Sequence, residues 1–253
     1  MKLITTTVGR KGPEDELQNQ ERFRAAEQAL EKAVKLGAEL MTLPAGFFTA
    51  RSSQVRDAMA NSLIGKAKQL GVAIVFGIDQ EVKNPKTDGE IIAKGLLLPY
   101  YGYAWSRSEE SIHCWQQRSS TSENQWLVSE AHCKEVRLIK VNGGFVGVLL
   151  CGEIFNQRIR HALAIRSPRP RAIVDIAHIG SGFRVWQGMK KLTELGFTSV
   201  CSVHTQREYA IKYCYTPGVG RKSTSIPDKY VFGPPRIELK LWTFWCHEHG
   251  DQG

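Results

Sequence analysis

The first part of the chain alternates between short apolar runs and longer amphipathic stretches. Two stretches carry apolar residues at helical spacing and end at a glycine, and we expect helices there, at about residues 17–36 and 54–70. Apolar runs that are typical of buried strands flank these helices, at 2–8, 38–43 and 72–78. This strand–helix–strand–helix–strand order is typical of an α/β layered domain.

The alternation continues after a less regular middle segment. A strand is expected at 91–98, and the aromatic segment PYYGYAW (99–105) is expected to be a loop or a short strand. The later apolar runs predict strands at 136–141, 145–151, 172–177, 199–203 and near 237–245. Helices are expected at 155–165 and 183–195. Without a repeat or linker, we expect a single domain over 1–253, with an irregular tail from about residue 246.

Composition and motifs exclude several classes of protein. The chain has no apolar run near the ~20 residues that a membrane span requires, and its start, MKLITTTVGRK, is unlike a signal peptide. Its six cysteines are dispersed and form no CxxC pair, which argues against a disulfide framework and a structural zinc site. We therefore expect a cytoplasmic protein with reduced thiols. No phosphate-binding glycine motif occurs, so no nucleotide cofactor is expected.

Charge suggests two further kinds of partner. The 34 Lys and Arg residues exceed the 25 Asp and Glu residues, giving a net charge of +9. The basic residues cluster only weakly, in RSPRPR (166–171) and VGRKST (219–224), and no nucleic-acid-binding signature accompanies them. We interpret them as solvated loop charges or as a site for an anionic small molecule, and expect no nucleic-acid partner. The tail WCHEHG (245–250) is interpreted as an irregular terminus, so no metal site is expected.

The segment GFVGVLLCGEIFN (144–156) carries the strongest chemical signal. Here a buried apolar strand ends in Cys151-Gly152-Glu153 and a helix begins. A thiol at this place lies beside the N–H groups and the positive dipole end of the helix, which favour a thiolate. The alternative is structural, because cysteine is among the residues most often buried and can simply fill the end of a strand.

Three ordered segments resemble the nitrilase, or carbon–nitrogen hydrolase, superfamily. RFRAAEQALEKAVKLGAELMTLP (22–44) is similar to the opening of that family, GVAIVFGI (71–78) to its third strand, and GFVGVLLCGEIF (144–155) to its nucleophile segment. The resemblance covers about residues 1–205. It implies a four-layer α-β-β-α sandwich that pairs as a homodimer through one helix layer.

The same resemblance implies a Glu-Lys-Cys triad. In that triad the cysteine attacks an amide or nitrile carbon, the glutamate takes the thiol proton, and the lysine stabilises the developing negative charge. Cys151 matches the nucleophile. Ala45 stands where the glutamate is expected, and Arg118, or its neighbour Gln117, where the lysine is expected. These departures indicate a divergent member of the family or, for Ala45, an introduced substitution.

Three other side chains are candidates for assisting Cys151. Glu153 follows it by two residues, Glu130 lies in the loop before the cysteine strand, and His178 ends the strand AIVDIAH. Each also has a structural interpretation, as an acid at a helix start, a solvated loop charge and a satisfied histidine respectively. His204 ends its strand in the same manner, and Asp175, inside its strand, is expected to make a buried hydrogen bond.

These observations favour one hypothesis and leave another open. The favoured one is a cysteine-dependent hydrolase that acts on the C–N bond of a small amide or nitrile. Cys151 is its nucleophile, Arg118 binds the substrate or the oxyanion, and Glu153 or Glu130 assists. The alternative is a catalytically inactive relative that binds a small anionic ligand or a protein partner, and Ala45 is the residue that suggests it.

Overall fold

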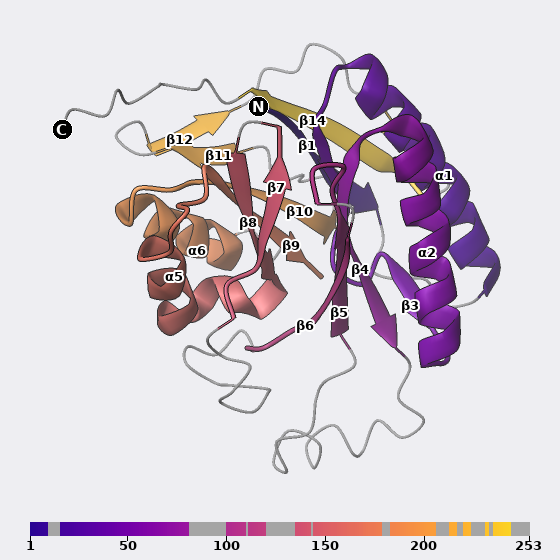
Figure 1. Cartoon of the computed structure of the whole chain (residues 1–253), viewed down its shortest axis with the longest axis horizontal. Helices are drawn as coiled ribbons and strands as arrows, with labels where there is room; N and C mark the ends of the chain where they lie inside the picture. Colours follow the sequence, from indigo (N-terminus) through magenta and orange to yellow (C-terminus); the bar gives the residue numbers. More distant parts are fainter. Residues whose placement is uncertain are drawn as a thin grey trace.

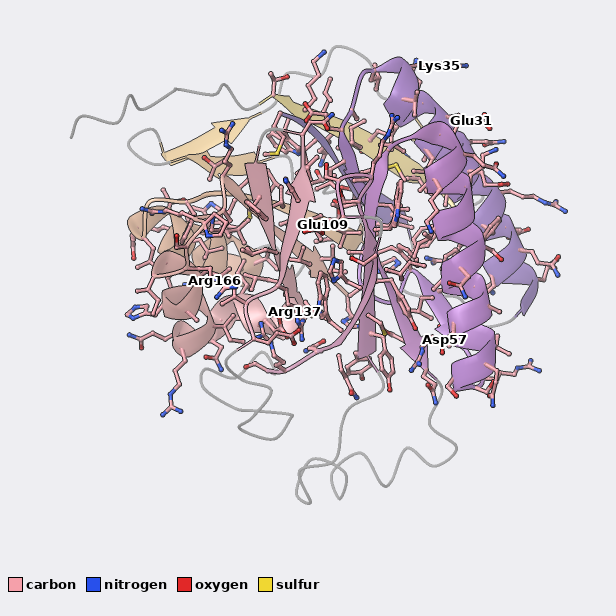
Figure 2. All side chains as sticks on the ribbon, in the orientation of Figure 1. Glu31, Lys35, Asp57, Glu109, Arg137 and Arg166 are labelled. Carbon is pink, nitrogen blue, oxygen red and sulfur yellow. The ribbon has the colours of Figure 1, made fainter. Side chains whose placement is uncertain are left out.

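A curled mixed sheet passes through the middle of the protein, and helices cover its outer faces (Figure 1). The computed structural model describes residues 1–9, 16–80, 100–109, 111–119, 135–142, 144–178, 183–205, 213–216, 220–223, 231–232 and 235–243. Helices α1 (Glu16–Lys35) and α2 (Ser53–Leu70) lie side by side on one face, and α5 (Gln157–Ala164) and α6 (Phe183–Glu194) on the other. Figure 2 labels Glu31 and Lys35, which lie on the outer side of α1.

The strands of the sheet follow the order β6-β5-β4-β2-β1-β10-β9-β8-β7 in the described part of the chain. Their bounds are β1 Lys2–Gly9, β2 Leu40–Thr42, β4 Ala73–Gln80, β5 Tyr100–Trp105, β6 Ile112–Gln116, β7 Leu138–Val141, β8 Gly144–Leu150, β9 Ala172–Ala177 and β10 Thr198–Thr205. The strands that pair alongside this path are β3 Phe48–Ala50, β11 Tyr213–Thr216, β12 Gly220–Ser223, β13 Val231–Phe232 and β14 Ile237–Thr243.

The central strands run in one direction. Parallel pairing joins β4 to β2, β2 to β1, β1 to β10, β10 to β9 and β9 to β8. Their carboxyl ends therefore meet at one edge of the sheet, where α/β proteins commonly place their binding and catalytic side chains.

Three buried clusters separate four layers. One lies between α1, α2 and the sheet, one lies between the two halves of the curled sheet, and one lies between the sheet and α5 and α6. Alternation along β9 shows the arrangement, because Ile173 faces the helices while Val174 faces the interior of the sandwich. The expected α-β-β-α layering is confirmed.

Local sequence signals explain the boundaries of α2. The hydroxyl of Ser52 accepts a hydrogen bond from the N–H of Val55 and caps the first turn. Gly71 ends the helix in the left-handed conformation with φ of 71°. No helix of the described residues is long and apolar enough to cross a membrane.

The sequence did not predict the strands β3, β6, β11, β12 and β13. The aromatic segment, expected as a loop or a short strand, forms the strand β5. The helix expected at 155–165 forms as α5, and a 3-10 helix, η2 (Cys151–Phe155), precedes it; Asn156 lies between the two and caps α5 with its side chain. The strand expected at 91–98 and the tail from 246 lie outside the described residues.

Candidate active site

Cys151 lies at the turn between β8 and η2, at the carboxyl end of its strand. Its φ is +48°, a left-handed value that no other non-glycine residue of the described chain adopts. Such a conformation is costly for a residue with a Cβ and persists only where the surroundings enforce it. The thiol is partly exposed, so the turn presents it at the edge of the sheet.

Glu153 holds this turn from inside. Its carboxylate is fully buried and accepts hydrogen bonds from the backbone N–H groups of Leu150, at 3.2 Å, and Arg118, at 2.7 Å. Arg137 donates to both of its oxygens, at 3.0 and 3.1 Å, and Arg118 Nε lies 3.2 Å from Oε1. Arg137 is labelled in Figure 2. Burial raises the pKa of Glu153, but the two guanidinium charges outweigh it and hold the pKa below its ordinary value.

His178 and Asp79 form a second charged pair at the same edge. His178 directly follows β9, and Asp79 is the penultimate residue of β4. The imidazole Nε2 lies 2.8 Å from Oδ1 and 3.1 Å from Oδ2 of Asp79. The thiol of Cys151 makes hydrogen bonds with the side chain and the backbone of His178. Asp79, His178 and Cys151 therefore interact with one another at this edge of the sheet.

The charges of these three side chains favour a thiolate beside an imidazolium. Burial raises the pKa of Cys151, but the neighbouring charge and hydrogen bonds of His178 outweigh it and lower the pKa. Burial lowers the pKa of His178, but the charges of Asp79 and Cys151 outweigh it and raise the pKa to about 10. The two shifts act in the same direction, because the lowered pKa of Cys151 and the raised pKa of His178 both favour placing the proton on the ring instead of on the sulfur.

The turn after β2 packs directly on the Asp79–His178 pair. Gly46 has φ of +61°, and a Cβ there would lie 2.6 Å from Oδ2 of Asp79 and 2.9 Å from Cδ2 of His178. Its neighbour Ala45 is buried, with an exposed fraction of 4%. The acid–histidine pair thus lies beside the place where the resemblance expects the family glutamate.

Comparison with protein families identifies the family of the chain. The family model described as carbon-nitrogen hydrolase matches residues 11–189. The chain belongs to the carbon–nitrogen hydrolase family. No curated protein matches the sequence significantly.

Solved structures show that this carbon–nitrogen hydrolase shares its fold with an amidase. An amidase from Nesterenkonia sp. superposes with a TM-score of 0.62 and 14% sequence identity, covering 96% of this chain and 90% of that chain. A Glu-to-Gln mutant of the amidase from Nesterenkonia sp. AN1 superposes with a TM-score of 0.64 and 15% identity over the same shares of each chain. That structure shows covalent addition of the acetamide moiety of fluoroacetamide at the active site cysteine.

The structure argues against the roles expected of two residues in this hydrolase. Arg118 has an exposed fraction of 2%, its Nε and Nη2 donate to Glu153, and its Nη1 donates to the carbonyl of Glu135. It is therefore engaged within the protein instead of offering its charge to a substrate or an oxyanion. Glu153 is equally engaged by its partners, so it supports the turn of Cys151 rather than taking the thiol proton. Glu130 lies outside the described residues.

Sequence reasoning named His178 as a candidate but missed Asp79. The available signal was an acid directly after the apolar run 72–78, near the carboxyl end of a strand that pairs in parallel with β2. Tyr100, directly opposite Asp79 on β5, adds a wall to the site, because its ring stands edge-on to the His178 ring with centroids 4.8 Å apart. No group of three or more metal-binding side chains occurs among the described residues.

Asp175 is buried within β9. Its Oδ2 accepts a hydrogen bond from Sγ of Cys201 at 3.7 Å, so the expected buried hydrogen bond is confirmed. Burial, reinforced by the negative charge on Cys151, raises the pKa of Asp175 well above its ordinary value. This shift favours the neutral form of the Asp175 carboxyl.

Proposed function

We propose that this carbon–nitrogen hydrolase cleaves the amide bond of a small molecule through a thioester on Cys151. His178 transfers protons, and Asp79 holds the imidazole and stabilises its charged form. The observation that carries the proposal is the series of contacts from Asp79 through His178 to Cys151, at the carboxyl ends of parallel strands. A nucleophile, a base and a third group that orients the base are the parts that covalent acyl transfer requires.

The first half of the reaction forms the thioester. The thiolate attacks the amide carbon, a C–S bond forms, and the π electrons of the carbonyl move to its oxygen. When the carbonyl re-forms, the C–N bond breaks, and the imidazolium of His178 gives its proton to the leaving nitrogen. The amine departs neutral, and the ring is left neutral beside Asp79.

The second half releases the acid and restores the site. The neutral ring of His178 takes a proton from water, and the oxygen of that water attacks the thioester carbon. The C–S bond then breaks, the electrons return to the sulfur, and the carboxylic acid leaves. The enzyme ends as it began, with a thiolate and an imidazolium.

This assignment accounts for both departures from the family pattern. Ala45 has no proton acceptor, but the base lies beside it in the Asp79–His178 pair. Arg118 is engaged with Glu153, but the positive charge beside the sulfur comes from the imidazolium. A positioned acid–base group typically raises the rate by a factor on the order of 10²–10⁴. In our proposal His178 supplies this factor in place of the family glutamate.

Turnover of simple amides tests the proposal. Purified protein is incubated with a panel of short primary amides, from acetamide to aromatic amides, and ammonia release is measured. We expect turnover that Cys151→Ala and His178→Ala abolish and that Cys114→Ala preserves, because Cys114 is an exposed thiol on β6 outside the site. Turnover that survives Cys151→Ala would show that the thiol is not the nucleophile.

Reaction with iodoacetamide separates the enzyme from an inactive relative. The rate is followed residue by residue at pH 6 by peptide mass spectrometry. A thiolate is the reactive form, so we expect Cys151 to be alkylated faster than Cys114. An inert Cys151 together with no amide turnover would favour the inactive, ligand-binding relative instead.

A further inference from the structure

Two buried side chains outside the site are linked to the backbone of His178, one directly and the other through the first. Arg22 lies on α1 and His204 on β10, each with an exposed fraction of 2%. Arg22 Nη1 lies 3.0 Å from Nε2 of His204, and His204 Nδ1 lies 3.2 Å from the carbonyl oxygen of His178. These contacts form a chain from the outer helix layer to the residue that holds the imidazole.

The chemistry of the two side chains fixes the direction of each hydrogen bond. A guanidinium has donors and no acceptor, so Arg22 must donate, and Nε2 of His204 must accept. The proton of a neutral His204 ring then resides on Nδ1, which donates to the carbonyl of His178. The positive charge of Arg22 also disfavours a second proton on that ring.

Arg22 holds both backbone segments that border the catalytic imidazole. The same Nη1 donates to the carbonyl of Phe47 at 3.0 Å, and the ring of Phe47 lies beneath the guanidinium, 5.4 Å from Cζ to the centroid. Phe47 follows Gly46, whose backbone packs against Asp79 and His178. One guanidinium therefore braces the turn on one side of His178 and, through His204, the strand end on the other.

The contact from His204 replaces backbone pairing where the strand ends. The β9–β10 ladder stops at the pair Ala177 and Val203, so His178 is the first residue beyond it. A residue in that place is held by what its backbone contacts, and here the side chain of His204 supplies the donor.

We propose that Arg22 and His204 are positioning residues that fix the backbone of His178, and so keep its imidazole directed at the thiol of Cys151. This inference rests on the function proposed above. Neither residue touches a reacting atom, so their effect passes entirely through the position of the ring.

The protonation state of His204 in the unaltered protein gives a direct test. Nitrogen chemical shifts of ¹⁵N-histidine-labelled protein distinguish the two neutral tautomers from the charged ring. We expect His204 to be neutral with its proton on Nδ1 at every pH at which the protein stays folded. A charged ring near pH 6, or a proton on Nε2, would overturn the proposed chain of donors.

A matched pair of variants tests the consequence. His204→Asn retains an N–H near the position of Nδ1, whereas His204→Leu keeps the volume and removes the donor. The readout is the pH midpoint of Cys151 alkylation by iodoacetamide. We expect the leucine variant to move the midpoint upward, toward the ordinary thiol pKa of 9.0, and the asparagine variant to stay close to the unaltered protein. Equal midpoints in the leucine variant and the unaltered protein would contradict the proposal.

Several groups face His178 besides His204. They are Asp79 on β4, Cys151 on η2, Asp175 on β9 and Tyr100 on β5. The two His204 variants leave these groups unchanged, so a shift reports on the backbone of His178. If the leucine variant does not fold, Arg22→Met serves with the same readout and the same expected upward shift, because it removes the donor to both Phe47 and His204.

Comparison with His178→Ala distinguishes the two proposals. If removal of the imidazole leaves the alkylation midpoint unchanged, the proposed acid–base role fails. If His178→Ala raises the midpoint while His204→Leu and Arg22→Met do not, only the positioning role is wrong.

Discussion

The imidazole of His178 interacts with two acidic groups, the carboxylate of Asp79 and the thiol of Cys151, and both raise its pKa. A ring in this position keeps its proton until a leaving group needs it, and the remaining charge of Asp79 then makes the neutral ring a better base. The family pattern expects a carboxylate to take the thiol proton itself. In the mechanism that we propose, a carboxylate acts through a histidine, in the division of roles that cysteine and serine hydrolases of unrelated folds also use.

Asp79→Asn tests this division at the scale of one side chain. The amide keeps the size of the carboxylate but removes the charge that raises the pKa of His178. The pKa of Cys151 should then rise in turn, and each unit of that rise lowers the thiolate fraction at pH 6 about tenfold. Alkylation of Cys151 at pH 6 measures the change, and we expect a fall of about tenfold or more.

A surface pair provides the matched control for Asp79→Asn. Glu109, labelled in Figure 2, lies 3.1 Å from Nε2 of His113, so Glu109→Gln also removes an acid from an acid–histidine pair. We expect this variant to leave Cys151 alkylation unchanged. If Cys151 is alkylated as fast in the Asp79→Asn variant as in the unaltered protein, the carboxylate of Asp79 does not influence the thiol.

Among the elements, three strand ends meet at Glu153. Arg118 follows β6, Arg137 precedes β7, and Leu150 ends β8, and each donates to this one carboxylate. Because β6 and β7 are the two ends of the strand order, the buried Arg–Glu–Arg group joins the outer strands of the two sheet halves. It also fixes the turn that gives Cys151 its positive φ.

Glu153→Gln is expected to destabilise the protein strongly. The amide keeps the shape but leaves two guanidinium groups buried without a compensating charge, and breaking a buried ion pair typically costs about 3–5 kcal/mol. Urea unfolding measures the loss. Glu31→Gln removes a carboxylate that pairs with Lys66 at 2.9 Å on the surface of α1, and it should change the stability little. Comparable unfolding midpoints for both variants would contradict a structural role for Glu153.

Local sequence signals predicted most elements but not the side chains that meet between them. Periodicity placed α1, α2 and the parallel strands, because apolar spacing directly reflects which face is buried. Asp79 and His178 are 99 residues apart, and their contact depends on how the sheet curls. Arg118 and Glu153 are similarly joined across 35 residues, so the resemblance located both positions without indicating that they neutralise each other.

At the scale of the whole molecule, the parallel strands and the curl of the sheet place the candidate catalytic side chains at one edge of the sheet. Asp79, Cys151 and His178 come from β4, the end of β8 and the end of β9, and β4 lies on the opposite half of the sandwich from the other two. The site therefore exists only while the two halves stay packed on their shared interior cluster. The titration of the site residues should therefore affect how the free energy of global unfolding depends on pH.

The proton balance of the Cys151–His178 pair gives a specific pH profile. The folded pKa of His178, about 10, lies above its ordinary 6.5, so its contribution to stability is complete below 6.5 and is lost as the pH rises toward 10. The pKa of Cys151 is lowered from its ordinary 9.0, so its contribution is complete above 9 and is lost as the pH falls through the lowered value. Where both effects act, the folded and unfolded states bind the same number of protons, and the stability is flat.

Cys151→Ala should remove this compensation. The folded protein then holds the extra proton of His178 that the unfolded chain has released, and the free energy of unfolding should fall between pH 7 and 9, by at most about 1.4 kcal/mol per pH unit. Urea unfolding of both proteins across this range measures the difference, with Cys114→Ala as a control that should follow the unaltered protein. If the free energy of unfolding depends on pH in the same way in the unaltered protein and in the Cys151→Ala variant, Cys151 and His178 do not share a proton. A thiol that is neutral in the folded protein would not offset the extra proton of His178.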